Sequence, residues 1–199
     1  MRRRFLPGLL AAALLFLPAC SGAAADASIS PDLTESTQDV LEAFGMAGTA
    51  SLLSFQGPEE AITLRLRVHH LGEDGAWEEA DTWGTSIGEE RTPVDCLSGT
   101  LAIQLQEDGS LGFHIRSGGG LASCQTEPIG LEPAASARCF LTESRDLPLN
   151  QEVPVALLLY GADGDGIPVC SLEDFADPSR LAGLELVQAV TVECTDQAL

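Results

Sequence analysis

The stretch that decides the fold is residues 101–115, which read Leu-Ala-Ile-Gln-Leu-Gln-Glu-Asp-Gly-Ser-Leu-Gly-Phe-His-Ile. Apolar and polar residues alternate on both sides of Glu107-Asp108-Gly109, and a period of two is typical of strands with one buried face. A three-residue turn with Gly109 left-handed pairs apolar residues across the strands: Leu105 with Leu111, Ile103 with Phe113, and Leu101 with Ile115. A two-residue Asp-Gly turn would pair glutamines with two of these apolar residues instead. The three-residue turn, and an antiparallel hairpin around it, are therefore predicted.

Two further segments carry the same turn signature. In residues 64–84, around Glu73-Asp74-Gly75, the same register gives these cross-strand pairs: Arg67 with Asp81, His69 with Glu79, Arg65 with Trp83, Val68 with Ala80, and Leu66 with Thr82. In residues 153–169, around Ala162-Asp163-Gly164, it gives Leu159 with Ile167 and Leu157 with Val169. Residues 153–160 are almost continuously apolar, which is typical of a central strand covered on both faces.

The rest of the chain adds one strand and two short helical segments. The last strand is expected at residues 184–194. A short helix is expected at residues 34–44, with Ser36 and Asp39 as its capping box, and a helical turn at residues 177–180. Together these patterns predict an all-β chain: a single antiparallel β-sandwich or partly open barrel built from hairpins, with one or two short helices.

The chain is strongly acidic, with 30 acidic residues against 10 basic residues, all of them Arg. Removal of residues 1–19 would leave 7 Arg and a net charge of −23. Such a surface repels phosphate backbones, so nucleic acid is excluded as a partner, whereas a basic protein surface is electrostatically compatible.

The N-terminal 20 residues have the organisation of an export signal. Arg2-Arg3-Arg4 precedes 13 apolar residues at 5–17, a run too short to span a bilayer, which needs about 20. Leu17-Pro18-Ala19-Cys20 follows, and here the sequence resembles the precursors of bacterial lipoproteins. The resemblance implies a diacylglycerol group on the Cys20 thiol, cleavage before Cys20, and anchoring to the extracytoplasmic face of the cell membrane.

This resemblance divides the chain into three parts. Residues 1–19 are expected to be the signal peptide, residues 20–33 the lipidated cysteine and a flexible tether, and residues 34–199 the β-sandwich domain. Ordinary secretion is the alternative, because Ala23-Ala24-Ala25 also fits a signal peptidase site and would release a chain that starts at Asp26.

Five cysteines follow Cys20, and no two of them have the spacing of a zinc or thioredoxin motif: Cys96, Cys124, Cys139, Cys170 and Cys194. The pairs Cys124–Cys139 and Cys170–Cys194 are predicted as disulfides, because each would close a short loop beside predicted strands. Burial of several of them as small apolar side chains remains an equal alternative.

Three motifs suggest chemistry but lack their usual context. Gly84-Thr85-Ser86-Ile87-Gly88 matches the nucleophile elbow of serine hydrolases, yet no amphipathic helix follows it and His114 is the only later histidine. His69 and His70 are neighbours on a strand and should point to opposite faces. The loop that begins at Asp163 departs from a calcium loop at Ile167 and Pro168, although Asp174 fits its twelfth position. No metal or cofactor is therefore predicted.

The best candidates for a binding surface are Trp77 and Trp83, which the register places on the charged, outward face of their hairpin. The sequence thus predicts a membrane-anchored lipoprotein with a non-catalytic binding or structural β-domain, whose partner is an envelope protein or a glycan. The alternative function is an envelope serine hydrolase that uses Ser86.

Overall fold

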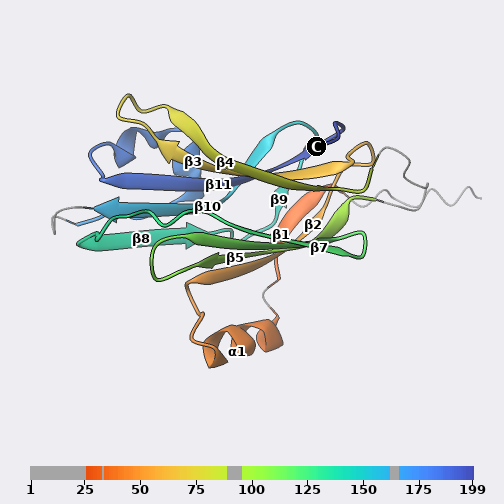
Figure 1. The fold of residues 1–199 in the computed structure, drawn as a ribbon, viewed down its shortest axis with the longest axis horizontal. Coiled ribbons are helices and arrows are strands. Elements are labelled where there is room, and N and C mark those ends of the chain that lie inside the picture. The colour runs from red at the N-terminus through yellow and green to blue at the C-terminus, as the bar shows by residue number, and fades with distance from the viewer. Residues whose placement is uncertain (1–25, 33, 89–95, 162–165) are drawn as a thin grey trace, which may run out of the picture.

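Two antiparallel sheets pack face to face in the computed structural model, which describes residues 26–32, 34–88, 96–161 and 166–199 (Figure 1). Sheet A consists of β7 (Gly120–Gln125), β6 (Leu111–Ser117), β5 (Ser98–Leu105), β2 (Ala50–Gln56), β1 (Ser28–Pro31) and β9 (Arg145–Asp146), in that order. Sheet B consists of β4 (Trp77–Ser86), β3 (Thr63–Leu71), β11 (Leu186–Thr195), β10 (Glu152–Gly161) and β8 (Ala135–Phe140). The prediction of an antiparallel sandwich is confirmed, and the two sheets stay open rather than closing into a barrel.

The hydrophobic core lies between the two sheets. Sheet A contributes Leu53, Ile103 and Phe113, and sheet B contributes Leu66 and Val190, all of them fully buried. Burial of one such side chain stabilises the fold by roughly 1.5–3 kcal/mol, so this inner layer is the main source of stability.

The hairpin of β5 and β6 has the predicted register. Leu105 pairs with Leu111, and Ile103 pairs with Phe113. Gly109 has a φ of 77°, the left-handed conformation that the three-residue turn requires. The Oδ1 atom of Asp108 accepts hydrogen bonds from the backbone N–H and the hydroxyl of Ser110, which stabilise the turn.

The hairpin of β3 and β4 agrees with its prediction only near the turn. His69 pairs with Glu79 as expected, but Asp81 lies opposite Val68, so Ala80 is an extra residue in β4. Beyond this β-bulge the predicted pairs are wrong by one position: Leu66 pairs with Trp83, Arg67 with Thr82, and Arg65 with Gly84. A shift by one residue exchanges the two faces of a strand, so Trp83 turns toward the core.

The predicted third hairpin is wrong. β10 pairs with β11 on one side and β8 on the other, so Leu159 lies opposite Val187 and Ala137. Residues 166–170 are not a strand, and the turn at 162–164 lies outside the described residues. Pro168 lacks the N–H that a ladder needs, whereas β11 supplies a long apolar strand. The central position predicted for residues 153–160 is confirmed.

A short cover segment, defined here as residues 170–181, packs on the outer face of sheet B. It contains two 3-10 helices, η1 (Leu172–Phe175) and η2 (Pro178–Leu181). Asp177 caps η2 as predicted, and Ser171 with Asp174 forms a capping box on η1. The cover segment explains why β10 and β11 are buried on both faces.

The N-terminal part differs from its prediction in two ways. Residues 28–31, expected to belong to the tether, form β1 between β2 and β9, and Ile29 is fully buried. The helix α1 (Glu35–Ala43) is capped by the hydroxyl of Thr34, which accepts from the Thr37 N–H, and not by the predicted capping box. Figure 1 shows α1 on the outer side of sheet A, and none of its residues is buried. Among the described residues, no helix is long and apolar enough to cross a membrane.

Candidate functional site

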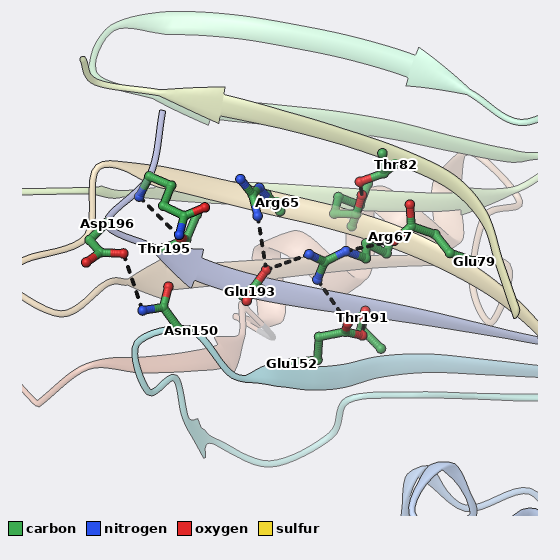
Figure 2. Close-up of polar contacts among 12 residues, drawn as sticks. Arg65, Arg67, Glu79, Thr82, Asn150, Glu152, Thr191, Glu193, Thr195 and Asp196 are labelled. Atoms are coloured by element: carbon green, nitrogen blue, oxygen red, sulfur yellow. Dashed lines mark hydrogen bonds and ion pairs between the residues drawn. The ribbon is translucent and has the colours of Figure 1, made fainter. Parts of the chain in front are cut away.

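The densest charged cluster of the described residues lies on the outer face of sheet B, around Arg67 (Figure 2). The guanidinium contacts three carboxylates, each from a different strand: Nε lies 3.0 Å from Glu79, Nη1 lies 2.9 Å from Glu152, and Nη2 lies 2.7 Å from Glu193. The side chains of Arg67 and Glu193 are only 14% and 13% exposed. Because β3, β4, β10 and β11 each supply one member, the cluster connects four strands of the sheet.

His69 extends this cluster. Its Nε2 atom lies 2.9 Å from Glu152 Oε2 and 3.1 Å from Thr191 Oγ1, and the Thr191 hydroxyl donates to the same Glu152 oxygen at 2.8 Å. The hydrogen bond from His69 lowers the pKa of Glu152, helped by Thr191 and Arg67 and opposed by burial.

The geometry of His69 does not match that of a catalytic relay. A histidine that activates a hydroxyl uses one ring nitrogen for the hydroxyl and the other for the orienting carboxylate. Here the single Nε2 atom faces both Thr191 and Glu152. The cluster therefore has the arrangement of a structural network that keeps Glu152 ionised.

Trp77 attaches the cover segment to this cluster. Its Nε1–H donates to the Phe175 carbonyl at 2.9 Å, and the two ring centroids are 5.1 Å apart. The Phe175 ring also lies 5.7 Å from the ring of His69. Trp77 therefore packs under η1, where it contributes to the attachment of the cover segment.

Trp83 lies on the opposite face of sheet B. Its ring centroid is 5.5 Å from that of Phe113 in sheet A, so it packs between the two sheets. The prediction that Trp77 and Trp83 share one outward surface is wrong, because the bulge at Ala80 moves Trp83 to the inner face.

Ser86 is held at the end of β4 by backbone groups. Its hydroxyl donates to the Ile62 carbonyl at 3.0 Å and accepts from the Gly88 N–H at 3.1 Å. Ser86 pairs with Thr63, six residues before His69 on β3, which corresponds to about 20 Å along a strand. His114 lies on β6 of the other sheet, where its Nδ1 contacts Ser123. Within the described ranges, no histidine contacts Ser86.

The described residues contain no group of three or more His, Cys, Asp or Glu side chains that could hold a metal ion. His70 points between the sheets, where its Nε2 lies 3.1 Å from Gln188 Nε2, while His69 points outward. Asp174 is buried and accepts from the Arg180 guanidinium with both carboxylate oxygens. Asp174, which fitted the twelfth position of a calcium loop, is thus held in an ion pair with Arg180. Asp163, the first position of that loop, lies outside the described residues.

The cysteines are not arranged as predicted. The Sγ atoms of Cys139 and Cys170 lie 2.8 Å apart, while Cys194 is fully buried in the core and Cys124 belongs to the edge strand β7. The predicted pairs Cys124–Cys139 and Cys170–Cys194 are therefore wrong, because Cys139 has Cys170 as its neighbour. Cys20 lies outside the described residues.

A groove between α1 and the outer face of sheet A was not predicted. Its volume is about 530 Å³, and its lining is mostly apolar: Val40, Leu41, Met46, Ala50, Leu52 and Ala102 are among its residues. Known ligand sites have volumes of about 300–1,000 Å³. No residue of α1 is buried, and residues of this helix and of β2 and β5 line the groove together.

Comparisons of this chain with protein-family models, with curated proteins and with solved structures found no match.

Proposed function

We propose that this protein is a membrane-anchored extracytoplasmic lipoprotein whose β-sandwich is a non-catalytic binding or structural module. The observation that carries the proposal is the order of features in residues 2–20: three arginines, 13 apolar residues, and Leu17-Pro18-Ala19-Cys20. Each methylene of an acyl chain that enters the bilayer contributes about 0.8 kcal/mol, so a cysteine with two or more chains is a stable anchor.

The start of the folded domain supports this proposal. β1 begins at Ser28, eight residues after Cys20, and eight extended residues span at most about 29 Å. The anchor would therefore keep the sandwich close to the membrane. The processed chain has a net charge of −23, so anionic lipid headgroups would repel the sandwich.

The anchor is tested by replacement of its cysteine. Cells that express Cys20→Ser should release the protein from the membrane fraction or accumulate it with its signal peptide uncleaved, whereas Cys96→Ser should stay membrane-bound. A Cys20→Ser protein that stays in the membrane fraction with residues 1–19 removed, as in the wild type, would contradict the proposal.

The groove beside α1 supports a binding role. Its lining is mostly apolar, and α1, which forms one wall, also carries Glu35, Asp39 and Glu42 and no basic residue. The partner that fits this chemistry is an apolar protein segment flanked by basic side chains.

A library of amphipathic basic peptides tests this role. Peptides that bind the wild type should lose affinity for Leu52→Asp, which places a charge in the groove, and should retain it for Leu121→Asp. Leu121 is the matched control because it is 64% exposed on the same sheet and does not line the groove. Absence of any binding peptide, or equal binding by both variants, would contradict a binding role for the groove.

A further inference from the structure

Cys139 and Cys170 meet on the outer face of sheet B although 31 positions separate them in the chain. Cys139 lies on β8 opposite Leu157 of β10, and Cys170 directly precedes Ser171, the N-cap of η1. The two Sγ atoms are 2.8 Å apart, and the Cys170 thiol lies 3.3 Å from the Leu157 carbonyl.

The position of this pair defines one end of the cover segment. In the register of sheet B, Cys139, Leu157, Ala189 and His69 form one row of neighbours across β8, β10, β11 and β3. Cys170 contacts the β8 end of this row, and Phe175 contacts the β3 end at His69. The cover segment thus crosses the sheet, with the aromatic contacts of Phe175 at one end and the cysteine pair at the other.

We propose that Cys139 and Cys170 form a disulfide bond that fastens the cover segment to β8. Sulfur atoms in a disulfide are about 2.05 Å apart, so these two need to move by less than 1 Å. Cys194 is fully buried in the core, and Cys124 lies on the edge of the other sheet, so neither competes for Cys139. Formation in the cell also requires an oxidising compartment, and this part rests on the proposed extracytoplasmic location.

The chemistry of the pair is thiol–disulfide exchange with a small-molecule disulfide such as glutathione disulfide. The hydrogen bond from Cys170 lowers the pKa of the Cys139 thiol, against the effect of burial, so Cys139 is the first nucleophile. Its thiolate attacks one sulfur of the small disulfide, whose S–S bond breaks and releases one small thiolate.

The second step completes the bond. The Cys170 thiol gives its proton to solvent, and its thiolate attacks the Cys139 sulfur and displaces the second small thiolate. Two protein thiols thereby lose two electrons in total, and the small disulfide is reduced to two thiols. Both cysteines line a pocket of about 270 Å³ beside Arg145, which gives a small disulfide access to them.

Peptide mapping tests the proposal directly. Because the chain has no Lys, trypsin cleaves only after Arg, and each of the five cysteines falls in its own peptide: 92–116, 117–138, 139–145, 146–180 and 181–199. The purified full chain is incubated with glutathione disulfide, alkylated under denaturing conditions and digested. Peptide 139–145 should appear joined to 146–180, and reduction should separate the two.

Single variants show whether the pair is specific. In Cys139→Ser, Cys170 should be alkylated or carry one glutathione, while in Cys124→Ser the joined peptides should still form. Oxidation should raise the thermal midpoint of the wild type by several degrees and leave that of Cys139→Ser unchanged. A joined pair with other members, or two separate peptides after oxidation of the purified wild type, would overturn the proposal.

Alkylation in intact cells separates this proposal from the proposed function. Joined peptides recovered from cells would support both the Cys139–Cys170 disulfide and the extracytoplasmic location. Peptides that join in the purified chain but arrive reduced from cells would contradict the extracytoplasmic location and leave the disulfide chemistry supported.

Discussion

Arg67→Met should destabilise the protein by about 3 kcal/mol, because this substitution leaves three carboxylates without their shared cation. The contact with Glu193 should contribute most, about 2 kcal/mol, since the Glu193 side chain is only 13% exposed. Glu152 is 31% exposed and Glu79 is 48% exposed, so solvent screening reduces their shares to roughly 0.5 kcal/mol each. Methionine keeps most of the aliphatic volume, so the loss reports the charge and its hydrogen bonds.

Urea unfolding followed by fluorescence of Trp77 and Trp83 measures this loss. With a slope of about 2 kcal/mol per molar urea, the midpoint should fall by about 1.5 M. Arg145→Met is the matched control, because Arg145 pairs with Glu173, whose side chain is 76% exposed, and its loss should cost less than about 0.5 kcal/mol. A loss below about 1 kcal/mol for Arg67→Met, or equal losses for the two variants, would refute the reasoning.

Three further predictions concern other parts of the fold. Burial lowers the pKa of His70 from its ordinary 6.5, and the neighbouring His69 lowers it further. The carboxylates of Asp81 and Glu78 raise this pKa, but their effect is smaller than that of burial. The unfolded chain therefore binds this proton more readily than the folded chain, so the free energy of unfolding should fall as the pH drops below about 6.5. Urea titrations at about pH 7 and about pH 5 measure this fall, which should be smaller in His70→Gln than in the wild type. Val40→Ser in α1 should change the unfolding free energy by less than about 0.5 kcal/mol, because Val40 is 53% exposed, while Leu53→Ala in the core should cost about 3 kcal/mol; equal costs would show that α1 is structurally required. Gln188→Leu removes a buried Oε1 acceptor that has no hydrogen-bond partner, but it also removes the contact of Gln188 Nε2 with His70. Because these two effects oppose each other, calorimetry should show a midpoint within about 5 °C of the wild type, and a larger decrease would contradict this.

Local patterns in the sequence predicted the parts of the fold that neighbouring residues determine. The turn at Gly109 and the register of β5 with β6 follow from the alternation of side chains and from one left-handed glycine. The cap of η2 at Asp177 follows from Asp-Pro spacing. The sequence also contains a signal for η1, because Ser171 and Asp174 have the spacing of a capping box.

Contacts between distant segments explain the predictions that failed. The bulge at Ala80 has no glycine to mark it, and it brings Trp83 to Phe113, which belongs to the other sheet. The choice of β11 as the partner of β10 likewise depends on packing across the whole sheet. The Cys139–Cys170 contact requires the cover segment to cross sheet B, and the spacing of cysteines in the chain does not record such a crossing.

The mass of the mature N-terminal peptide tests the central claim most directly. Protein purified from the membrane fraction in detergent should begin at Cys20, and its peptide 20–65 should carry the added mass of a diacylglyceryl group, with or without a further acyl chain on the amino terminus. An unmodified mature chain that begins at Asp26, or a chain that retains residues 1–19, would contradict the account of a lipid-anchored protein.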